Sequence, residues 1–102
     1  MTYTVEFLKT AAEELAGLPK DAQRQIMKRV DGLQADPRPS GVEQLKGAEK
    51  FLRIRVGDYR VIYSVEARQI VVLVVRIAHR KAVYENLKVL ASRVSGWRQR
   101  TK

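Results

Sequence analysis

The stretch FLRIRVGDYRVIYSV, residues 51–65, decides the fold of this chain. Hydrophobic and polar side chains alternate on both sides of Gly57-Asp58, which is the pattern of two antiparallel strands joined by a two-residue turn. With that turn, Arg55 faces Arg60 across the ladder. Because cross-strand partners share one face of a sheet, one face of this hairpin is predicted to be hydrophobic. That face carries Leu52, Ile54, Val56, Tyr59, Val61 and Tyr63.

The opposite face of the hairpin carries Arg53, Arg55 and Arg60, which we call the arginine face. Like charges directly opposite each other destabilise a sheet by roughly 0.2–1 kcal/mol, and the hairpin offers them no acidic partner across the ladder. A guanidinium presents a planar fork of donors that matches phosphate oxygens. The pattern therefore favours a phosphate-binding surface. The alternative is a solvated outer face whose arginines extend into water or pair with Glu66 or Asp58.

Ahead of the hairpin, the sequence predicts one strand and two helices. Residues 2–8, TYTVEFL, alternate as a half-buried strand does. From Lys9 the hydrophobic spacing becomes helical and stops near Gly17, and Pro19 then opens a second, amphipathic helix. The segment DPRPSG, residues 36–41, ends that helix because proline lacks an amide and disfavours helix in the residue before it. The two helices are predicted to form a hairpin that covers one sheet face.

The rest of the chain predicts a loop, a central strand and a last helix. Residues 41–50 read as a loop with a partly extended middle, and QIVVLVVRI, residues 69–77, as a strand buried on both faces. Residues 80–94 carry hydrophobic side chains at helical spacing. This order predicts an α+β fold: a small antiparallel sheet of about four strands with an N-terminal helical hairpin and a C-terminal helix. We expect one domain over residues 1–95 and a mobile basic tail at 96–102.

Composition narrows the class of protein. The chain has 102 residues, 45% hydrophobic and 30% charged, which suits one soluble domain. Its longest hydrophobic run, IVVLVV at 70–75, is far shorter than the ~20 residues that span a bilayer. No secretory signal is visible at the N-terminus, and the absence of cysteine removes disulfides and cysteine metal sites. We expect a cytoplasmic protein without a membrane partner.

The charge is strongly basic and unevenly placed. The formal net charge is +9, and residues 37–102 hold fifteen basic and five acidic residues, against five and six in residues 1–36. A basic half on a small domain indicates a polyanion partner, nucleic acid before membrane. The alternative is a basic surface that only keeps the protein soluble.

The segment RIAHRKAVY, residues 76–84, holds further candidate residues. His79 is the only histidine, the residue type that most often acts as an acid or base near neutral pH, although a lone histidine is more often structural than catalytic. Tyr84, four residues after Arg80, is predicted on the same helical face, where its ring either packs on the sheet or stacks on a base. One histidine, no cysteine and dispersed acids predict no metal or cofactor site. This inventory suits metal-free RNA cleavage, in which a base activates the 2′-OH and cations stabilise the phosphorane.

Three motifs, LKG (45–47), FLRIRVGDYRVIYSV (51–65) and IAHRKAVY (77–84), closely resemble the RelE/ParE toxin superfamily of toxin–antitoxin modules. The resemblance covers about residues 2–90 and implies a microbial-RNase-like sheet with helices. In this superfamily, RelE-type members cleave mRNA in the ribosomal A site without a metal ion. ParE-type members poison DNA gyrase instead and lack the nuclease residues.

The resemblance to RelE-type members implies a set of catalytic residues on the scissile phosphate. That set is Arg53, Arg55, Arg60, Arg80 and Tyr84. Arginine does not readily lose its proton, so the general base is left open among His79, Glu49 and two lysines. Those lysines, with two other cations, are expected to bind RNA. The expected RNA-binding residues are Lys46, Lys50, Arg76 and Lys81.

The resemblance therefore implies the toxin of a type II toxin–antitoxin system that acts as a ribosome-dependent mRNA endonuclease. It implies a RelB-like antitoxin, through which the complex would bind operator DNA. An acidic or amphipathic segment that folds on binding would suit this basic surface, either neutralising the arginine face or displacing the last helix. The alternatives are a ParE-like gyrase inhibitor and an inactive protein that binds its antitoxin or acts as a corepressor.

Overall fold

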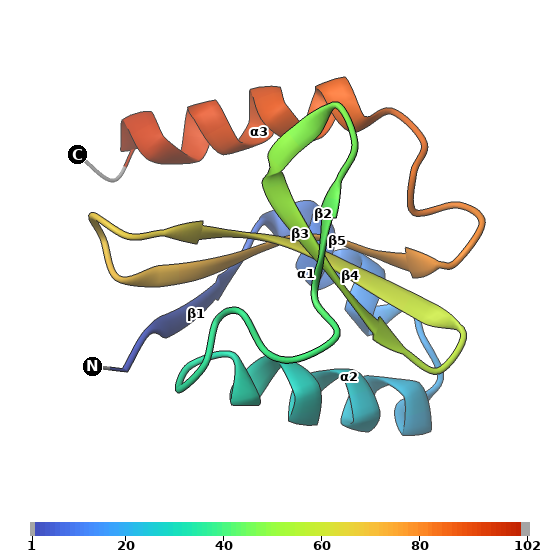
Figure 1. Ribbon diagram of the computed structural model, residues 1–102. Helices are drawn as coiled ribbons and strands as arrows, with labels where there is room; N and C mark the ends of the chain where they lie inside the picture. Colours follow the sequence, from blue (N-terminus) through green and yellow to red (C-terminus); the bar gives the residue numbers. More distant parts are fainter. Residues whose placement is uncertain (1, 101–102) are drawn as a thin grey trace.

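A computed structural model of the protein shows a five-stranded sheet with helices on both sides (Figure 1). It describes residues 2–100, apart from the side chain of Glu49. The strands follow the order β1-β5-β4-β3-β2 across the sheet, so the predicted α+β class is confirmed, with five strands in place of about four. The elements are β1 (Thr4–Phe7), α1 (Lys9–Ala16), α2 (Lys20–Gly32), β2 (Glu43–Leu45), β3 (Ala48–Val56), β4 (Tyr59–Glu66), β5 (Val71–His79) and α3 (Leu87–Arg100).

The sheet is mixed, where the sequence predicts an antiparallel one. β1 pairs with β5 in parallel, while β5, β4, β3 and β2 pair antiparallel with their neighbours. A parallel pair needs a long connection, and the chain between β1 and β5 is long enough to bring the two strands together in this direction. The additional strand, β2, is the extended middle of the 41–50 loop and pairs with β3.

The β3–β4 hairpin has the predicted register. Val56 faces Tyr59 and Arg55 faces Arg60, so Gly57-Asp58 is the two-residue turn. Gly57 has φ +58°, the left-handed conformation that a type II′ turn requires at its first central position. The prediction that the two hairpin faces differ in character therefore holds in the structure.

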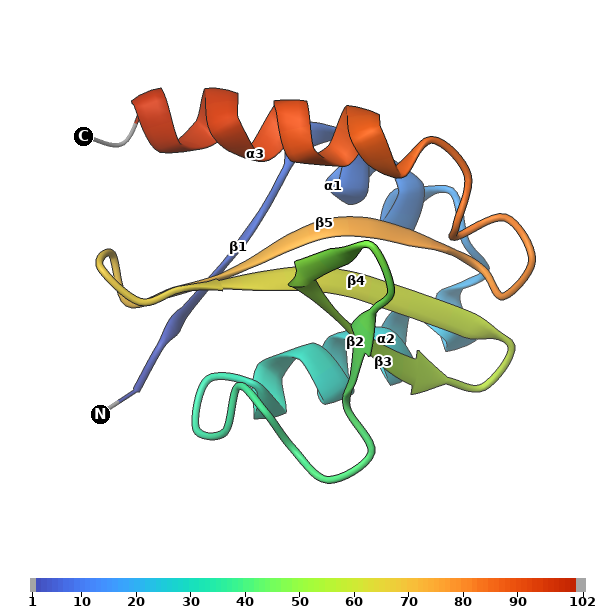
Figure 2. The same ribbon diagram turned by 45° about the horizontal axis from the view of Figure 1, so that its top comes forward.

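The helices cover three different parts of the sheet. α2 and α3 lie on opposite faces of the sheet in both ribbon views (Figures 1 and 2). α1 instead packs beside β5 past the end of β1, where the Ile77 amide donates a 3.0 Å hydrogen bond to Glu14 Oε1. The N-terminal helical hairpin thus does not cover one face as a unit: α2 covers a face, and α1 shields part of an edge that β1 leaves open.

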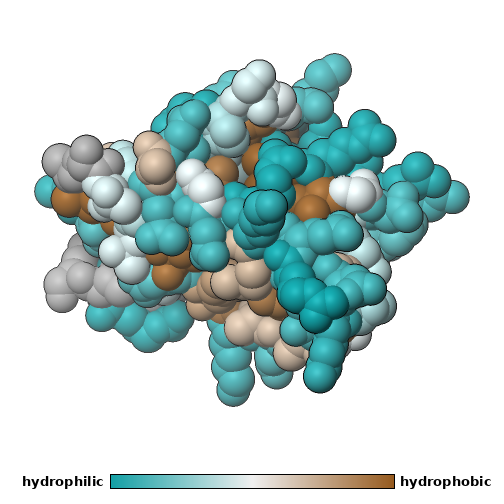
Figure 3. All heavy atoms as spheres, turned by 90° about the horizontal axis from the view of Figure 1, so that it is seen from below, coloured by the Kyte–Doolittle hydropathy of each residue, from teal (hydrophilic) through white to brown (hydrophobic). Residues whose placement is uncertain are grey.

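The core between α2 and the sheet is built from the hydrophobic face of the hairpin. Ile26 and Val30 of α2 are fully buried with Ile54 and Val61 of the sheet. Tyr63 is fully buried too; its hydroxyl donates a 2.6 Å hydrogen bond to the Pro37 carbonyl, and burial raises the pKa of Tyr63 to about 12. Figure 3 looks from below, onto the α2 side, and shows hydrophilic side chains around a hydrophobic area near the middle of this surface.

The last helix begins later and ends later than predicted. Residues 80–86 form turns, and Asn86 has φ +56°, a left-handed conformation that a right-handed helix cannot contain. α3 therefore starts at Leu87, and it continues across the predicted boundary at residue 95 to Arg100. Trp97 is only 7% exposed, and its indole nitrogen donates a 3.3 Å hydrogen bond to Glu6 Oε1. Residues 96–100 are thus packed helix, in contrast to the predicted mobile tail.

An ion pair joins the C-terminal half of α3 to the sheet. Arg98 binds both carboxylate oxygens of Glu66, at 2.7 Å from Nε and 3.1 Å from Nη2, and Glu66 is 6% exposed. Burial alone would raise the pKa of the Glu66 carboxyl, but the hydrogen bonds and charge of Arg98 outweigh it and hold that pKa below its ordinary value. Among the described residues, no helix is long and hydrophobic enough to cross a membrane.

Candidate active site

The structure places the arginine face on the side of the sheet that also carries α3. Cross-strand pairing puts Arg55 opposite Arg60 and Arg53 opposite Ile62, so the three guanidiniums share one face near the β3–β4 turn. Along β3, the same face continues through Phe51, which lies under α3. The arginine face therefore lies at the end of this surface that is closest to the turn.

Arg60 is fixed by backbone carbonyls of its own turn. Its Nη1 donates to the carbonyls of Gly57 at 3.1 Å and Tyr59 at 2.9 Å. These bonds hold the guanidinium beside the β3–β4 turn before any ligand arrives, so part of the entropy of ordering a long side chain is lost on folding.

Arg60 also lies in a strongly positive field. Its pKa is lowered first by burial and then by the charges of Arg55, Arg53 and Arg80, while Asp58 acts in the opposite direction. Four guanidiniums are thus close enough to repel one another. An anion bound among them would relieve this repulsion.

A backbone hydrogen bond holds Arg80 next to the arginine face. Its amide donates a 2.9 Å hydrogen bond to the Asp58 carbonyl, which ties the turns after β5 to the β3–β4 turn. Within the described part of the chain, no carboxylate lies within ion-pair distance of Arg55, Arg60 or Arg80. These three cations are therefore available to a ligand.

Arg53 differs from the other arginines because it has an acidic partner. Its Nη2 lies 2.5 Å from Oε2 of Glu43, the residue opposite it in the β2–β3 ladder. The ring of Tyr84 covers the same guanidinium, with its centroid 5.5 Å from Arg53 Cζ. The sequence predicts that the hairpin arginines have no acidic partner within the hairpin. This is correct for the hairpin alone, but in the assembled sheet β2 supplies Glu43 as a partner for Arg53. Glu66, considered as a partner for the arginines, pairs with Arg98 instead.

Sequence reasoning missed Glu43 as a member of this site. The residue lies in the segment predicted as a loop, and only the β2–β3 pairing brings its carboxylate to the arginine face. The signal that could have located it is the extended middle of residues 41–50 next to a long strand.

His79 is not brought to the arginine face. It pairs with Tyr59 in the β4–β5 ladder, and Tyr59 belongs to the hydrophobic face of the hairpin. The two rings meet edge to face, with centroids 6.1 Å apart. Because cross-strand partners share a face, His79 lies on the side of the sheet opposite the arginines.

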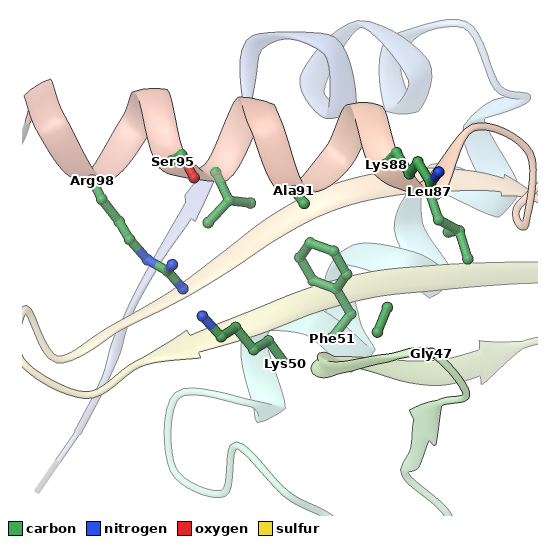
Figure 4. Close-up of a pocket in the computed structure, with 10 residues that line it drawn as sticks. Gly47, Lys50, Phe51, Leu87, Lys88, Ala91, Ser95 and Arg98 are labelled. Carbon is green, nitrogen blue, oxygen red and sulfur yellow. The ribbon is translucent and has the colours of Figure 1, made fainter.

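The other candidate cations have separate positions. Lys46 is exposed in the β2–β3 turn, and Lys81 is exposed in the turns after β5. Arg76 lies on the arginine side of the sheet, but its guanidinium donates to backbone carbonyls of residues 83 and 85. Lys50 lines a groove under α3 (Figure 4). The side chain of Glu49 lies outside the described part of the structure.

A groove under α3 lies near this face and has a volume of about 560 Å³. Figure 4 shows Phe51 beneath the helix, with Lys50 and Arg98 toward one end and Leu87 toward the other. The lining is mostly hydrophobic and carries polar side chains at its margins. It consists of Gly47, Ala48, Lys50, Phe51, Leu87, Lys88, Ala91, Val94, Ser95 and Arg98.

The chemistry available on the arginine face is that of guanidiniums, the Glu43 carboxylate and the Tyr84 phenol. Among the side chains that the structure describes, no three His, Cys, Asp or Glu residues cluster as ligands for a metal ion. A small α+β domain with a preformed cationic face suited to phosphate is the class of protein that the fold and the site define.

A family model described as "ParE toxin of type II toxin-antitoxin system, parDE" matches residues 5–84. The chain belongs to this family of toxins, within the RelE/ParE superfamily, which confirms the resemblance seen in its motifs.

Relatives and solved structures carry RelE names. The putative toxin RelE1 of Methanocaldococcus jannaschii is 27% identical over 89 residues, which cover 84% of this chain and 99% of that protein. A chain of the archaeal RelE–RelB complex from Pyrococcus horikoshii is 35% identical, with a TM-score of 0.68 over 78% of this chain and 97% of its own length. A chain of the toxin–antitoxin complex RelBE2 from Mycobacterium tuberculosis is 26% identical, with a TM-score of 0.70, covering 78% of this chain and all of the other.

Proposed function

We propose that this protein is the toxin of a RelBE-type toxin–antitoxin system and cleaves translated mRNA in the ribosomal A site without a metal ion. The observation that carries the proposal is the arginine face itself. Arg55, Arg60 and Arg80 lie together, with no carboxylate partner among the described side chains, beside Tyr84 and the Glu43–Arg53 pair. That arrangement supplies a phosphate site, a base and a phenol on one side of the sheet.

The arginines would act on the scissile phosphate. Guanidiniums form short, charge-assisted hydrogen bonds to phosphate oxygens, and they are most useful where charge develops in the transition state. Arg60 is already held in place by its turn carbonyls, and the charges of the other three arginines act on it. Binding of the phosphate would replace repulsion among the arginines by attraction.

Glu43 is the general base in this proposal. A base must reach the 2′-OH from the side on which the phosphate is bound, and Glu43 is on that side whereas His79 is on the other. The carboxylate would take the 2′-OH proton as the 2′-oxygen attacks phosphorus and the bond to the 5′-oxygen breaks. The leaving 5′-oxygen would take its proton from the Tyr84 hydroxyl, leaving a 2′,3′-cyclic phosphate and a 5′-hydroxyl.

Cell-free translation with the purified toxin tests the proposal, with primer extension on the message to locate the cuts. We expect cuts inside translated codons that vanish when ribosomes are left out. A matched message with a single 2′-deoxynucleotide at the cut position should stay intact there, because the nucleophile is missing. Cleavage of the 2′-deoxy message would contradict the mechanism, and an intact message with normal protein synthesis would contradict the function.

Gyrase inhibition is a second candidate because the matching family model is described as a ParE toxin. A gyrase inhibitor would act as a protein-binding module, and its arginine face would be dispensable. Supercoiling of relaxed plasmid by gyrase, with and without the toxin, separates the two readings. Inhibition of supercoiling together with unaffected translation would favour the second candidate.

A RelB-like antitoxin is the proposed partner, since the solved structures that resemble this chain include RelE–RelB complexes. The groove under α3 is the proposed docking site for one of its segments. Its hydrophobic lining with Lys50 and Lys88 at the margin suits an amphipathic acidic segment. Ala91→Trp would fill the groove and should weaken antitoxin binding by at least ~10-fold, whereas Gln99→Trp, outside the groove on the same helix, should not. Equal affinities of both variants would place the antitoxin elsewhere.

A further inference from the structure

We propose that Arg76 is a positioning residue, which holds Tyr84 over the arginine face and does not itself bind RNA. The inference rests on the proposed function in one respect, namely that Tyr84 acts on the RNA. Its structural part, that Arg76 sets the position of the Tyr84 ring, stands on contacts within this chain.

The contacts of Arg76 bracket Tyr84 in the sequence. The same terminal nitrogen, Nη1, donates to the carbonyl of Val83 at 3.1 Å and to the carbonyl of Glu85. The carbonyl groups of the residues before and after Tyr84 are therefore bound to one guanidinium. Since that guanidinium is anchored on a central strand of the sheet, the backbone at Tyr84 is tied to the sheet.

The segment has few other ways to place the tyrosine. Val83 is fully buried and fixes the backbone on the N-terminal side, whereas Tyr84 is 40% exposed, so burial constrains its ring less than it constrains Val83. The backbone here is a series of turns, in which the amides of Ala82 and Val83 both donate to the His79 carbonyl and the Glu85 amide donates to the Ala82 carbonyl. Turns of this kind are the parts of a fold that open most readily.

These hydrogen bonds place the Tyr84 ring next to Arg53. Arg76 and Arg53 are both on the arginine side of the sheet, each as a cross-strand neighbour of Ile62. The hydrogen bonds from Arg76 to the carbonyls of residues 83 and 85 hold Tyr84 over β4, with its ring centroid 5.5 Å from Arg53 Cζ. Because Arg53 is bound to Glu43, the tyrosine, the arginine and the carboxylate form one connected group. Loss of the two hydrogen bonds from Arg76 would free Tyr84 and so disturb the geometry of all three side chains.

A cycle of variants separates positioning from RNA binding. We compare the wild type, Arg76→Ala, Tyr84→Ala and the double variant in single-turnover cleavage of ribosome-bound message. Arg76→Ala should lower the maximal rate by at least ~10-fold with little change in the concentration for half-maximal rate, because misplacement of a catalytic group slows the chemical step. In the Tyr84→Ala background it should cost nothing more. An additional loss in the double variant, or a loss confined to RNA affinity, would mean that Arg76 touches RNA.

A spectroscopic measurement tests the positioning without any reference to activity. An aromatic ring shifts the NMR signals of side-chain protons that lie against it, so the Arg53 signals should change when Tyr84 is replaced by alanine. Arg76→Ala should produce the same change, Arg76→Lys a part of it, and Arg68→Ala, a control in the exposed β4–β5 turn, none. Arg53 signals that stay as in the wild type in Arg76→Ala would overturn the inference. A wild type that shows these shifts but never cleaves RNA would instead overturn the proposed function.

Discussion

The two faces of the β3–β4 hairpin are built from neighbouring residues, but one face packs in the core and the other carries the arginines. On the α2 side, Ile54 is 1% exposed and Val61 is fully buried. On the other side, Arg55 opposes Arg60 and both remain in contact with solvent. Successive residues of a strand point to opposite faces, so the same fifteen-residue stretch provides the core and the candidate active site. Substitutions at neighbouring residues of one strand should therefore affect stability and activity separately.

The largest effect on stability is expected from the core face. Ile54→Ala should lower the free energy of unfolding by about 2–5 kcal/mol, because it leaves a cavity between α2 and the sheet. Urea unfolding followed by circular dichroism measures it. The neighbouring Arg55→Ala is the control and should lose no stability. Equal losses for both variants would end the distinction between the faces.

The two candidate bases, Glu43 and His79, lie on opposite faces of the sheet, so their substitution tests which face is catalytic. Glu43→Gln removes the base but keeps the shape of the side chain, and should slow cleavage by ~10²-fold or more. His79→Gln should leave the rate close to that of the wild type. Single-turnover rates across a range of pH decide between them. A strong loss in His79→Gln with little effect of Glu43→Gln would reverse the assignment.

The Glu66–Arg98 ion pair shows that the arginine side of the sheet also contributes stability where α3 covers it. Glu66→Gln should destabilise the protein by about 1.5–3 kcal/mol at neutral pH, because it weakens charge-assisted hydrogen bonds. The pKa of Glu66 is lowered by folding, so its stabilisation is complete above the unfolded value near 4.5 and is lost as the pH falls below it.

The gap in stability between Glu66→Gln and the wild type should therefore close as the pH is lowered below about 4.5. Thermal unfolding of both proteins over this range measures the gap. Glu85→Gln, a change at an exposed carboxylate, serves as the control and should follow the wild type throughout. A gap that stays constant into acid would show that the ionised carboxylate is not what stabilises the fold.

The smallest effect is expected at the arginine face and has the opposite sign. Arg55→Ala removes one of two like charges that face each other, so it should raise the free energy of unfolding by roughly 0.2–1 kcal/mol. The gain should shrink when salt is added, because salt screens the repulsion. Unfolding in low and high salt checks this. A loss of stability in low salt would mean that Arg55 makes a favourable contact.

Sequence reasoning performed best where the pattern is local. The hairpin register, the arginine face and the buried central strand all follow from alternation within one or two strands, and the motifs identified the superfamily. The face of His79 required the β4–β5 register, which shifts between Ile62 and Tyr63 and so cannot be counted along the chain. The Glu43–Arg53 pair and the parallel β1–β5 pair depend on contacts between distant segments. The late start of α3 depends on the left-handed Asn86, which helical spacing alone does not reveal.

The most direct test of the account is one pair of measurements on Arg60→Ala: the single-turnover rate of cleavage of ribosome-bound message and the free energy of unfolding. The charges of Arg55, Arg53 and Arg80 all act on Arg60, and turn carbonyls hold its guanidinium in place. We predict a rate lower by ~10²-fold or more, as for the loss of one transition-state donor, in a protein whose free energy of unfolding stays close to that of the wild type, because the lost turn hydrogen bonds and the relieved repulsion offset each other. A wild-type rate in a folded Arg60→Ala protein would contradict it.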